Sequence, residues 1–232
     1  MVLKVRNYVS AGPKMRVLRL ELADAPFVFL AGQAVMLGRH GQRLRRPYSI
    51  ACAPEDAARD GTLEFLVGID AAGRAGAHLD GIAHGSAVEL EGPFGRFSVP
   101  DDPHETRFLF VGGGTGIAPL RAMLHHVLAR HPAAAVSVVH SARTSADLAY
   151  EKELRQLART GRIALTLTVT REPHASAWHG ERGRIGRRLL TRHLTCTDTL
   201  CFVCGPLAFV ASVAPLLHDL GVASRRILKD EW

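Results

Sequence analysis

Residues 108–119 read FLFVGGGTGIAP, and this stretch decides the fold of the second half of the chain. Its first four residues form a continuous apolar run, which is typical of a parallel strand buried on both faces. Glycines let the backbone approach a phosphate, and the N-terminus of a following helix offers it free N–H groups. Pro119 suits the first turn of such a helix. The stretch predicts a strand, a phosphate-binding loop and a helix, although Ala118 and Pro119 stand where GxGxxG has its third glycine.

Downstream of this loop, strand and helix patterns alternate to the end of the chain. Such alternation predicts a doubly wound parallel sheet with helices on both faces. We expect strands at 108–111, 136–140, 163–170, 200–203 and 227–228, and helices at 119–129, 147–160, with Leu148 on its apolar face, and 206–220.

The first hundred residues follow a different pattern, in which short apolar-polar alternations are separated by Gly, Pro and Asp clusters. This pattern predicts an N-terminal antiparallel Greek-key β-barrel. The alternating runs lie at 2–5, 17–22, 34–37, 63–67 and 88–90, with a short helix from Gly76 through Leu79. The pattern changes after Asp101-Asp102-Pro103, so we predict two domains, residues 1–102 and 103–232.

The charge is distributed unevenly between these halves. The chain has 232 residues, a formal net charge of +7 and 47% hydrophobic residues, which suits two small globular domains and excludes general disorder. Residues 1–104 carry 12 basic and 12 acidic side chains, whereas residues 105–232 carry 17 and 10. The excess favours an anionic ligand in the second half. Because no aromatic residues interleave the basic ones in a reader motif, we expect no nucleic-acid partner.

The uncharged stretch 200–217 is long enough to be mistaken for a short membrane helix. Gly205-Pro206 and Pro215 interrupt it, so a buried strand, a turn and a core helix explain it better. The N-terminus lacks the apolar core of a signal peptide. We expect a cytoplasmic protein with no membrane partner.

Three of the four cysteines, Cys196, Cys201 and Cys204, have the C-x4-C-x2-C spacing of a plant-type iron–sulfur cluster. No cysteine follows to supply the fourth ligand, and no second CxxC or paired histidine completes a zinc site. We therefore expect no metal, and free thiols, including Cys52, as in a reducing compartment.

Two further motifs could bind a flat, phosphorylated ligand. Residues 45–50 read RRPYSI. Arginine can bind a phosphate through two N–H groups, Tyr48 lies on the same strand face as Arg46, and Ser49 adds a hydroxyl. Cys204-Gly205-Pro206 follows a buried strand, at the edge where parallel sheets bind ligands. Each motif could also be structural, as an edge strand with solvated arginines or as a buried cysteine before a turn.

Taken in order, the motifs resemble the ferredoxin–NADP(+) reductase superfamily over nearly the whole chain. The resemblance implies an FAD-binding barrel followed by an NAD(P)-binding α/β domain. The motifs are FLAGQ at 29–33, RPYS at 46–49, GRAG at 73–76, GPFG at 92–95, the glycine loop at 112–119, CGP at 204–206 and the terminal EW at 231–232.

The resemblance also implies roles at the flavin. Arg46 would hold the pyrophosphate, Tyr48 would stack on the isoalloxazine, and Ser49 would hydrogen-bond near N5. Gly76 stands where the family usually has serine or threonine, so one hydroxyl contact is lost while the backbone N–H groups remain. The other residues assigned to flavin binding are Pro47, Val67, Arg74 and Ala75.

On the nicotinamide side, Cys204 would lie near the reacting carbon and Trp232 would cover the second flavin face. Plant-type members have a catalytic glutamate two residues before the end, where this chain has Asp230, with Glu231 next to last. The catalytic assignments are Ser49, Cys204, Glu231 and Trp232. The assignments to coenzyme binding are Gly114, Thr115, Gly116, Arg143, Thr144, Arg171, Arg184, Cys204, Gly205 and Pro206.

The choice between NADH and NADPH depends on the 2′-phosphate of the adenosine ribose. An acidic residue at the end of the second strand would favour NAD, but residues 140–144 read HSART. Residues 171–192 contain six arginines and two glutamates, as in bacterial NADP-dependent members. We therefore expect NADPH to be favoured.

The implied chemistry is hydride transfer between NAD(P)H and FAD N5. In the first hypothesis the enzyme passes electrons to a small acidic carrier, ferredoxin or flavodoxin, or to an oxygenase. The second is an NAD(P)H:flavin reductase with flavin as substrate, which Gly76 favours and Trp232 opposes. The third is a non-catalytic electron-transfer subunit of a larger complex. The sequence leaves the acceptor and the oligomeric state open.

Overall fold

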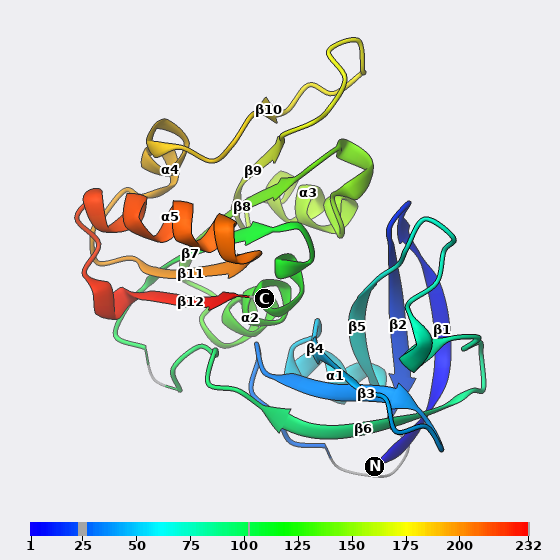
Figure 1. Cartoon of the computed structure of the whole chain (residues 1–232). Helices are drawn as coiled ribbons and strands as arrows, with labels where there is room; N and C mark the ends of the chain where they lie inside the picture. The colour runs from blue at the N-terminus through cyan, green and yellow to red at the C-terminus, as the bar shows by residue number, and fades with distance from the viewer. Residues whose placement is uncertain (23–26, 102, 232) are drawn as a thin grey trace.

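The computed structural model describes residues 1–22, 27–101 and 103–231. Strands of the first half form one antiparallel sheet in the order β4-β3-β6-β1-β2-β5 (Figure 1). An isolated bridge between Ile50 and Phe65 joins its two outer strands, so the sheet curls into a barrel. The predicted Greek-key barrel is confirmed. Its strands are β1 (Val2–Gly12), β2 (Met15–Glu21), β3 (Ala34–Arg39), β4 (Arg46–Ser49), β5 (Thr62–Gly68) and β6 (Ala87–Phe94).

Two helical elements accompany the barrel. The 3-10 helix η1 (Ala77–Leu79) lies where the sequence predicts a short helix. Helix α1 (Pro54–Asp60) was not predicted, because Ala57 is its only buried residue and it has almost no apolar face. Its sequence does carry end signals, since Pro54 opens it and Gly61, with φ of 64°, closes it.

The second half forms a parallel sheet in the order β10-β9-β8-β7-β11-β12. Strand order reverses beside β7, because β8 follows on one side and β11 lies on the other. This is the switch point at which open α/β sheets bind ligands, and it confirms the predicted doubly wound fold. The strands are β7 (Arg107–Gly113), β8 (Ala135–Ala142), β9 (Ala164–Val169), β10 (Glu181–Arg182), β11 (Leu200–Gly205) and β12 (Ile227–Glu231).

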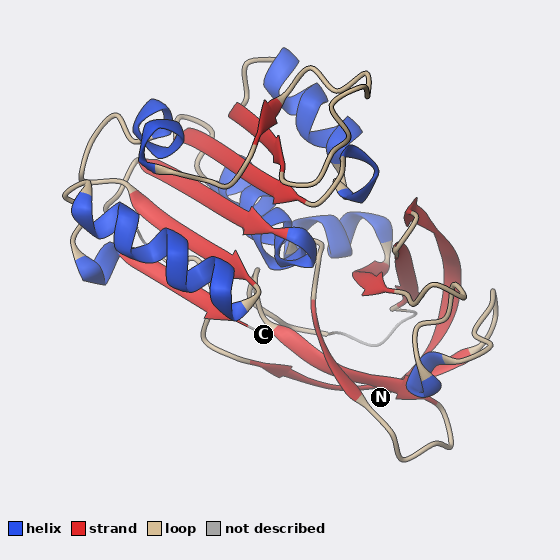
Figure 2. Ribbon diagram, turned by 45° about the horizontal axis from the view of Figure 1, so that its top comes forward, coloured by secondary structure: helices blue, strands red, loops and turns tan. Residues whose placement is uncertain are grey.

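Helices cover both faces of this sheet (Figure 2). Helices α2 (Ile117–Arg130) and α3 (Glu151–Arg159) pack in the apolar cluster that contains Phe108 and Phe110. Helices α4 (Arg187–His193) and α5 (Leu207–Asp219) pack in the cluster that contains Leu109 and Val111, the intervening residues of β7. No helix of the described ranges is long and apolar enough to cross a membrane. The short 3-10 helices are η2 (Gly114–Gly116), η3 (Ser145–Asp147) and η4 (Ser224–Arg226).

The helix expected at 147–160 begins only at Glu151. Asp147 ends η3, and Tyr150 has a φ of 60°, a left-handed conformation that interrupts the chain before α3. Leu148 is buried, but it lies ahead of the helix, so the prediction that it belongs to the helical face is wrong.

The two sheets share one apolar cluster, in which Met15, Ala31 and Leu66 of the barrel half join Ala118 and Met123 of α2. Burial of these side chains holds the halves together. The boundary predicted at residue 102 lies outside the described residues and stays a prediction.

A charged cluster reinforces this contact. The Arg121 guanidinium of α2 donates to the carbonyl oxygen of Ala51 at 2.6 Å. It also lies 3.3 Å from the Glu64 carboxylate of β5 and 2.9 Å from that of Glu153 in α3. One arginine thus links the barrel to two helices of the second half.

His125, one turn further along α2, forms a second link. Its imidazole contacts the carboxylates of Asp56 in α1, at 2.7 Å, and of Glu153. Burial disfavours the imidazolium, but the hydrogen bonds that it donates to both carboxylates outweigh this effect and raise the pKa of His125. Burial likewise opposes ionisation of Asp56, yet His125 brings the pKa of that carboxyl down to about 2.

Candidate functional site

The glycine loop between β7 and α2 packs directly on the end of β11. A Cβ placed on Gly116 would lie 2.3 Å from the carbonyl oxygen of Cys204, so only glycine fits there. Gly114 has a φ of 57° and open space where a side chain would be. The loop therefore brings Thr115 and Gly116 beside Cys204, and it leaves its backbone accessible to a ligand.

His140 of β8 forms a hydrogen bond to the start of this loop. Its Nδ1 donates to the carbonyl oxygen of Gly112 at 3.3 Å, and the side chain is completely buried. Burial lowers the pKa of His140 to about 4, so the ring is neutral at physiological pH. Sequence analysis did not single out His140, because it lies within a predicted apolar strand.

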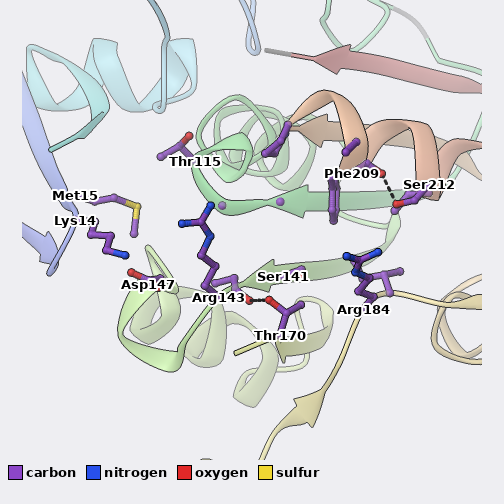
Figure 3. A pocket seen from close by; sticks show the side chains of 17 residues that line it. Lys14, Met15, Thr115, Ser141, Arg143, Asp147, Thr170, Arg184, Phe209 and Ser212 are labelled. Atoms are coloured by element: carbon purple, nitrogen blue, oxygen red, sulfur yellow. Dashed lines mark hydrogen bonds between the residues drawn. The ribbon is translucent and has the colours of Figure 1, made fainter. Parts of the chain in front are cut away.

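A pocket of about 500 Å³ lies at the carboxyl edge of the parallel sheet (Figure 3). Three predicted residues, Thr115, Arg143 and Arg184, line it together with Phe209 of α5. Gly114 and Pro206 line it as well, which completes one wall from the glycine loop to the start of α5. Cys204 and Gly205 lie buried behind that wall.

Arg171 and Thr144 are near this pocket but are not part of its lining. The N–H of Arg171 donates to the carbonyl oxygen of Arg143 at 2.7 Å, which places the ends of β8 and β9 side by side. The Thr144 hydroxyl donates to the Asp147 carboxylate at 2.8 Å, so it already has a partner.

The pocket is electropositive. Arg143, Arg184 and Lys14 line it, and within the described ranges none of these side chains forms an ion pair or hydrogen bond. Asp147 is the acidic residue of the lining, and one of its oxygens accepts hydrogen bonds from Thr144. An anionic ligand would therefore meet unpaired cations here.

Cys204 is 1% exposed at the end of β11. Burial and the neighbouring Asp230 carboxylate raise the pKa of its thiol, so the group is neutral at physiological pH. A neutral thiol supplies shape and polarisability at this position, whereas a nucleophile would require a thiolate.

Cys201 and Cys204 lie on opposite faces of β11. Cys201 packs in the α4–α5 cluster and Cys204 in the α2–α3 cluster. The CxxC spacing therefore does not bring these two sulfurs to one point. Among the described side chains, no group of three or more His, Cys, Asp or Glu is placed to hold a metal ion.

Strand β4 carries the predicted flavin residues. Arg46 and Pro47 are exposed, whereas Tyr48 and Ser49 are half-buried. The Tyr48 hydroxyl lies 2.7 Å from Nε2 of His78 in η1, and burial raises the pKa of Tyr48 to about 12. The sequence analysis missed His78, although it falls within the predicted short helix.

His78 also bears on whether FAD fits this site. Its Nδ1 is buried and has no hydrogen-bond partner among the described residues. A Cβ on Gly76 would lie 3.4 Å from that nitrogen, so the atom faces the turn that would support the pyrophosphate. Gly76 has a φ of 88° and leaves its backbone exposed to a ligand. A stacking ring, an exposed arginine and an unsatisfied polar atom beside a glycine turn fit a flavin dinucleotide.

Other flavin assignments have different surroundings. The Arg74 guanidinium pairs with the Asp70 carboxylate at 3.2 Å on its own loop, and Ala75 packs against the barrel core. Val67 is completely buried in that core. Its side chain therefore packs inside the barrel, and its assignment to flavin binding stays a prediction.

A second hollow, of about 510 Å³, lies between the barrel and β12. Ala34 and Phe94 line it from the barrel, and Leu228 to Asp230 line it from β12. Because Ala34 pairs with Ser49, this hollow adjoins the flavin strand. The backbone of Glu231 pairs with Gly205. The side chain of Glu231, and Trp232 as a whole, lie outside the described residues, so their catalytic assignments stay predictions.

Comparisons with known proteins agree with this geometry. A family model for the oxidoreductase FAD-binding domain matches residues 1–99, and one for the oxidoreductase NAD-binding domain matches residues 110–214. Ferredoxin–NADP reductase B of Sorangium cellulosum is 33% identical, covering 93% of this chain and 90% of that protein. The glycine betaine monooxygenase reductase subunit of Pseudomonas aeruginosa is 31% identical over 86% of this chain, which spans 56% of that protein.

Solved structures show the same architecture. A cytochrome P450 reductase of Amycolatopsis has a TM-score of 0.83 at 28% identity, covering 100% of this chain and 69% of that chain. A ferredoxin NADP+ reductase from Neisseria gonorrhoeae, solved with bound FAD and NADP, has a TM-score of 0.81 at 21% identity. The match covers 100% of this chain and 98% of that chain. The chain belongs to the ferredoxin–NADP(+) reductase superfamily and is a flavin-dependent oxidoreductase that uses FAD and NAD(P)H.

Proposed function

We propose that this protein oxidises NADPH in preference to NADH and passes the electrons to a separate redox protein. The observation that carries the coenzyme preference is the pocket lining, where Arg143 and Arg184 are unpaired and Asp147 is already bonded. An NAD-specific site would place a carboxylate at the end of the second strand, but β8 ends at Ala142 and Arg143 follows it.

The chain's own residues align the two ring systems. Bound FAD would supply the chemistry of accepting a hydride from the nicotinamide and releasing electrons singly or in pairs. Tyr48 presents a ring whose hydroxyl is held by His78. Ser49 lies beside it, and Arg46 remains exposed for the pyrophosphate.

On the coenzyme side, the backbone of Gly114, Thr115 and Gly116 and the N-terminus of α2 would bind the dinucleotide pyrophosphate. The neutral Cys204 thiol would contact the nicotinamide edge, and Gly205-Pro206 would hold the ring in place. Positioning of this kind supplies much of the rate enhancement in cofactor enzymes. In this proposal residues 1–102 bind FAD and residues 103–232 bind NADPH.

The proposed acceptor is a ferredoxin, a flavodoxin or an oxygenase. Relatives named as a ferredoxin reductase, a monooxygenase reductase subunit and an aromatic O-demethylase reductase subunit support a protein acceptor. Arg39 at the end of β3 and Arg43 between β3 and β4 are both exposed and favour an acidic carrier.

The test compares acceptors and coenzymes under the same conditions. FAD-loaded protein is assayed with NADPH and NADH, using an acidic ferredoxin, a flavodoxin and free FMN as acceptors. The proposal expects faster turnover with NADPH and with a protein acceptor. Efficient reduction of free FMN alone would instead identify a flavin reductase, an alternative that the missing hydroxyl at Gly76 favours.

A further inference from the structure

The wall of the coenzyme pocket is not built by the nucleotide-binding half alone. The turn between β1 and β2 of the barrel reaches across and contributes Lys14 and Met15 to the lining. Figure 3 shows the Lys14 side chain extending toward Asp147 and Arg143, on the side of the pocket where Thr115 lies. Arg184 and Ser212 lie at the opposite end in that view. A barrel lysine thus stands in the site of the other half.

The position of this turn is fixed by close contacts. Gly12 has a φ of 144°, and a Cβ there would lie 2.5 Å from the carbonyl oxygen of Ala146 in η3. The N–H of Ile69 donates to the carbonyl oxygen of Lys14 at 2.8 Å. Met15 is 4% exposed and packs in the apolar cluster shared by both halves. The backbone of Lys14 is therefore held at the edge of the pocket, although its side chain is exposed.

The charge on Lys14 has no partner of its own within the described ranges. Many other basic side chains of the chain are paired, such as Arg19 with Glu64 and Arg226 with Glu105. An ammonium in a pocket that Gly113, Gly114 and Thr115 of the glycine loop also line is placed to attract a phosphate.

We propose that Lys14 binds the pyrophosphate of the dinucleotide, and this inference rests on the proposed NAD(P)H-binding function. The pyrophosphate is common to NADH and NADPH, so Lys14 contributes affinity without discriminating between them. Because Lys14 belongs to the barrel, a bound dinucleotide is held by both halves at once.

The experiment measures dissociation constants by calorimetry on the FAD-loaded protein. The ligands are NADP+, NAD+ and adenosine 2′-monophosphate, which carries the 2′-phosphate but no pyrophosphate. The variants are Lys14→Met, Lys14→Arg and the matched control Lys4→Met, an exposed lysine elsewhere on β1. Lys14→Met should raise the dissociation constants for NADP+ and NAD+ by the same factor, about five- to tenfold. It should leave the dissociation constant for adenosine 2′-monophosphate unchanged. Lys14→Arg should restore most of the affinity, and Lys4→Met should match the wild type.

Each contrary outcome has its own meaning. Equal affinities in Lys14→Met and Lys4→Met would overturn the inference and leave the proposed function intact. Loss of affinity confined to NADP+ and adenosine 2′-monophosphate would also overturn it, since Lys14 would then bind the 2′-phosphate. Failure of the wild type to bind either dinucleotide would refute the proposed function itself. Because Lys14 is exposed, its replacement leaves the packing of the core unchanged.

Discussion

The Tyr48 hydroxyl and Nε2 of His78 lie 2.7 Å apart, and their rings stack with centroids 5.7 Å apart at an angle of 22°. Burial and the charge of Arg46 lower the pKa of His78, so a neutral imidazole meets a neutral phenol. The bond fixes the plane of the ring that we assign to the flavin. The two residues come from β4 and η1, which are thirty residues apart in the sequence.

Tyr48→Phe keeps the ring but removes the hydroxyl. We expect the dissociation constant for FAD to rise about fivefold. The reason is that losing a buried hydrogen bond costs about 1 kcal/mol and leaves Nε2 of His78 unsatisfied. Fluorescence titration of the flavin-free protein with FAD measures this. Tyr8→Phe is the matched control, since the buried Tyr8 hydroxyl has no partner among the described residues. Equal FAD affinities in the two variants would contradict the assignment.

Gly116→Ala tests the contact between the glycine loop and β11. The new methyl group would lie 2.3 Å from a backbone oxygen that cannot move cheaply, so the free energy of unfolding should fall by about 1–3 kcal/mol. NADP+ binding should weaken as the loop shifts. Gly186→Ala, in the same half and with open space at its Cβ, should change stability by less than about 0.5 kcal/mol. Thermal denaturation compares the stabilities of the two variants, and equal midpoints would refute the packing argument.

His125 makes the contact between the halves dependent on pH. Its pKa is raised in the folded state, so its contribution to stability is complete below the unfolded value of 6.5 and disappears as pH rises through the folded value. His125→Gln should lower the free energy of unfolding by about 1–3 kcal/mol at about pH 6, and by progressively less toward about pH 9.

Denaturation midpoints across this pH range measure the difference between wild type and His125→Gln. The exposed His218 serves as control, and His218→Gln should match the wild type throughout. Asp56 acts in a separate window, since its pKa near 2 means that its contribution is lost only as pH falls below about 4. A wild-type advantage that grows toward alkaline pH would contradict this account.

Arg143→Ala and Arg184→Ala test the coenzyme preference. Each removes an unpaired guanidinium from the pocket, so KM for NADPH should rise about tenfold while KM for NADH stays within about twofold. Arg159→Ala, an exposed arginine of α3 bonded to Gln156, is the control. Steady-state kinetics with both coenzymes decide the matter. A rise in both KM values would show that these arginines do not read the 2′-phosphate.

The sequence predicted those features that have a local steric or periodic signature. The glycines at 112–116 and the apolar run before them indicated a phosphate loop at a strand end, and the structure places both there. Alternation in the first hundred residues indicated the barrel in the same way. These signals lie within a few neighbouring residues, so they can be read without the tertiary structure.

Features that depend on distant partners could not be predicted. His78 gains its importance from Tyr48, thirty residues earlier, and Lys14 enters the pocket because the end of β1, at Gly12, packs against η3. Tyr150 adopts a left-handed conformation although it is not a glycine, so the sequence carries no signal for this interruption. The helix was therefore predicted to begin earlier than α3 does. The resemblance implies that Val67 binds flavin, but it does not show that strand alternation turns this side chain into the barrel core.

Our central claim is that this chain retains FAD on Tyr48 and reduces it with NADPH. The most direct measurement is the visible spectrum of the purified, desalted protein, followed anaerobically after NADPH is added. We predict a flavin spectrum corresponding to a single FAD per chain, which bleaches on mixing with NADPH. A colourless protein that reduces only added flavin, or a bound flavin that NADPH leaves oxidised, would contradict the claim.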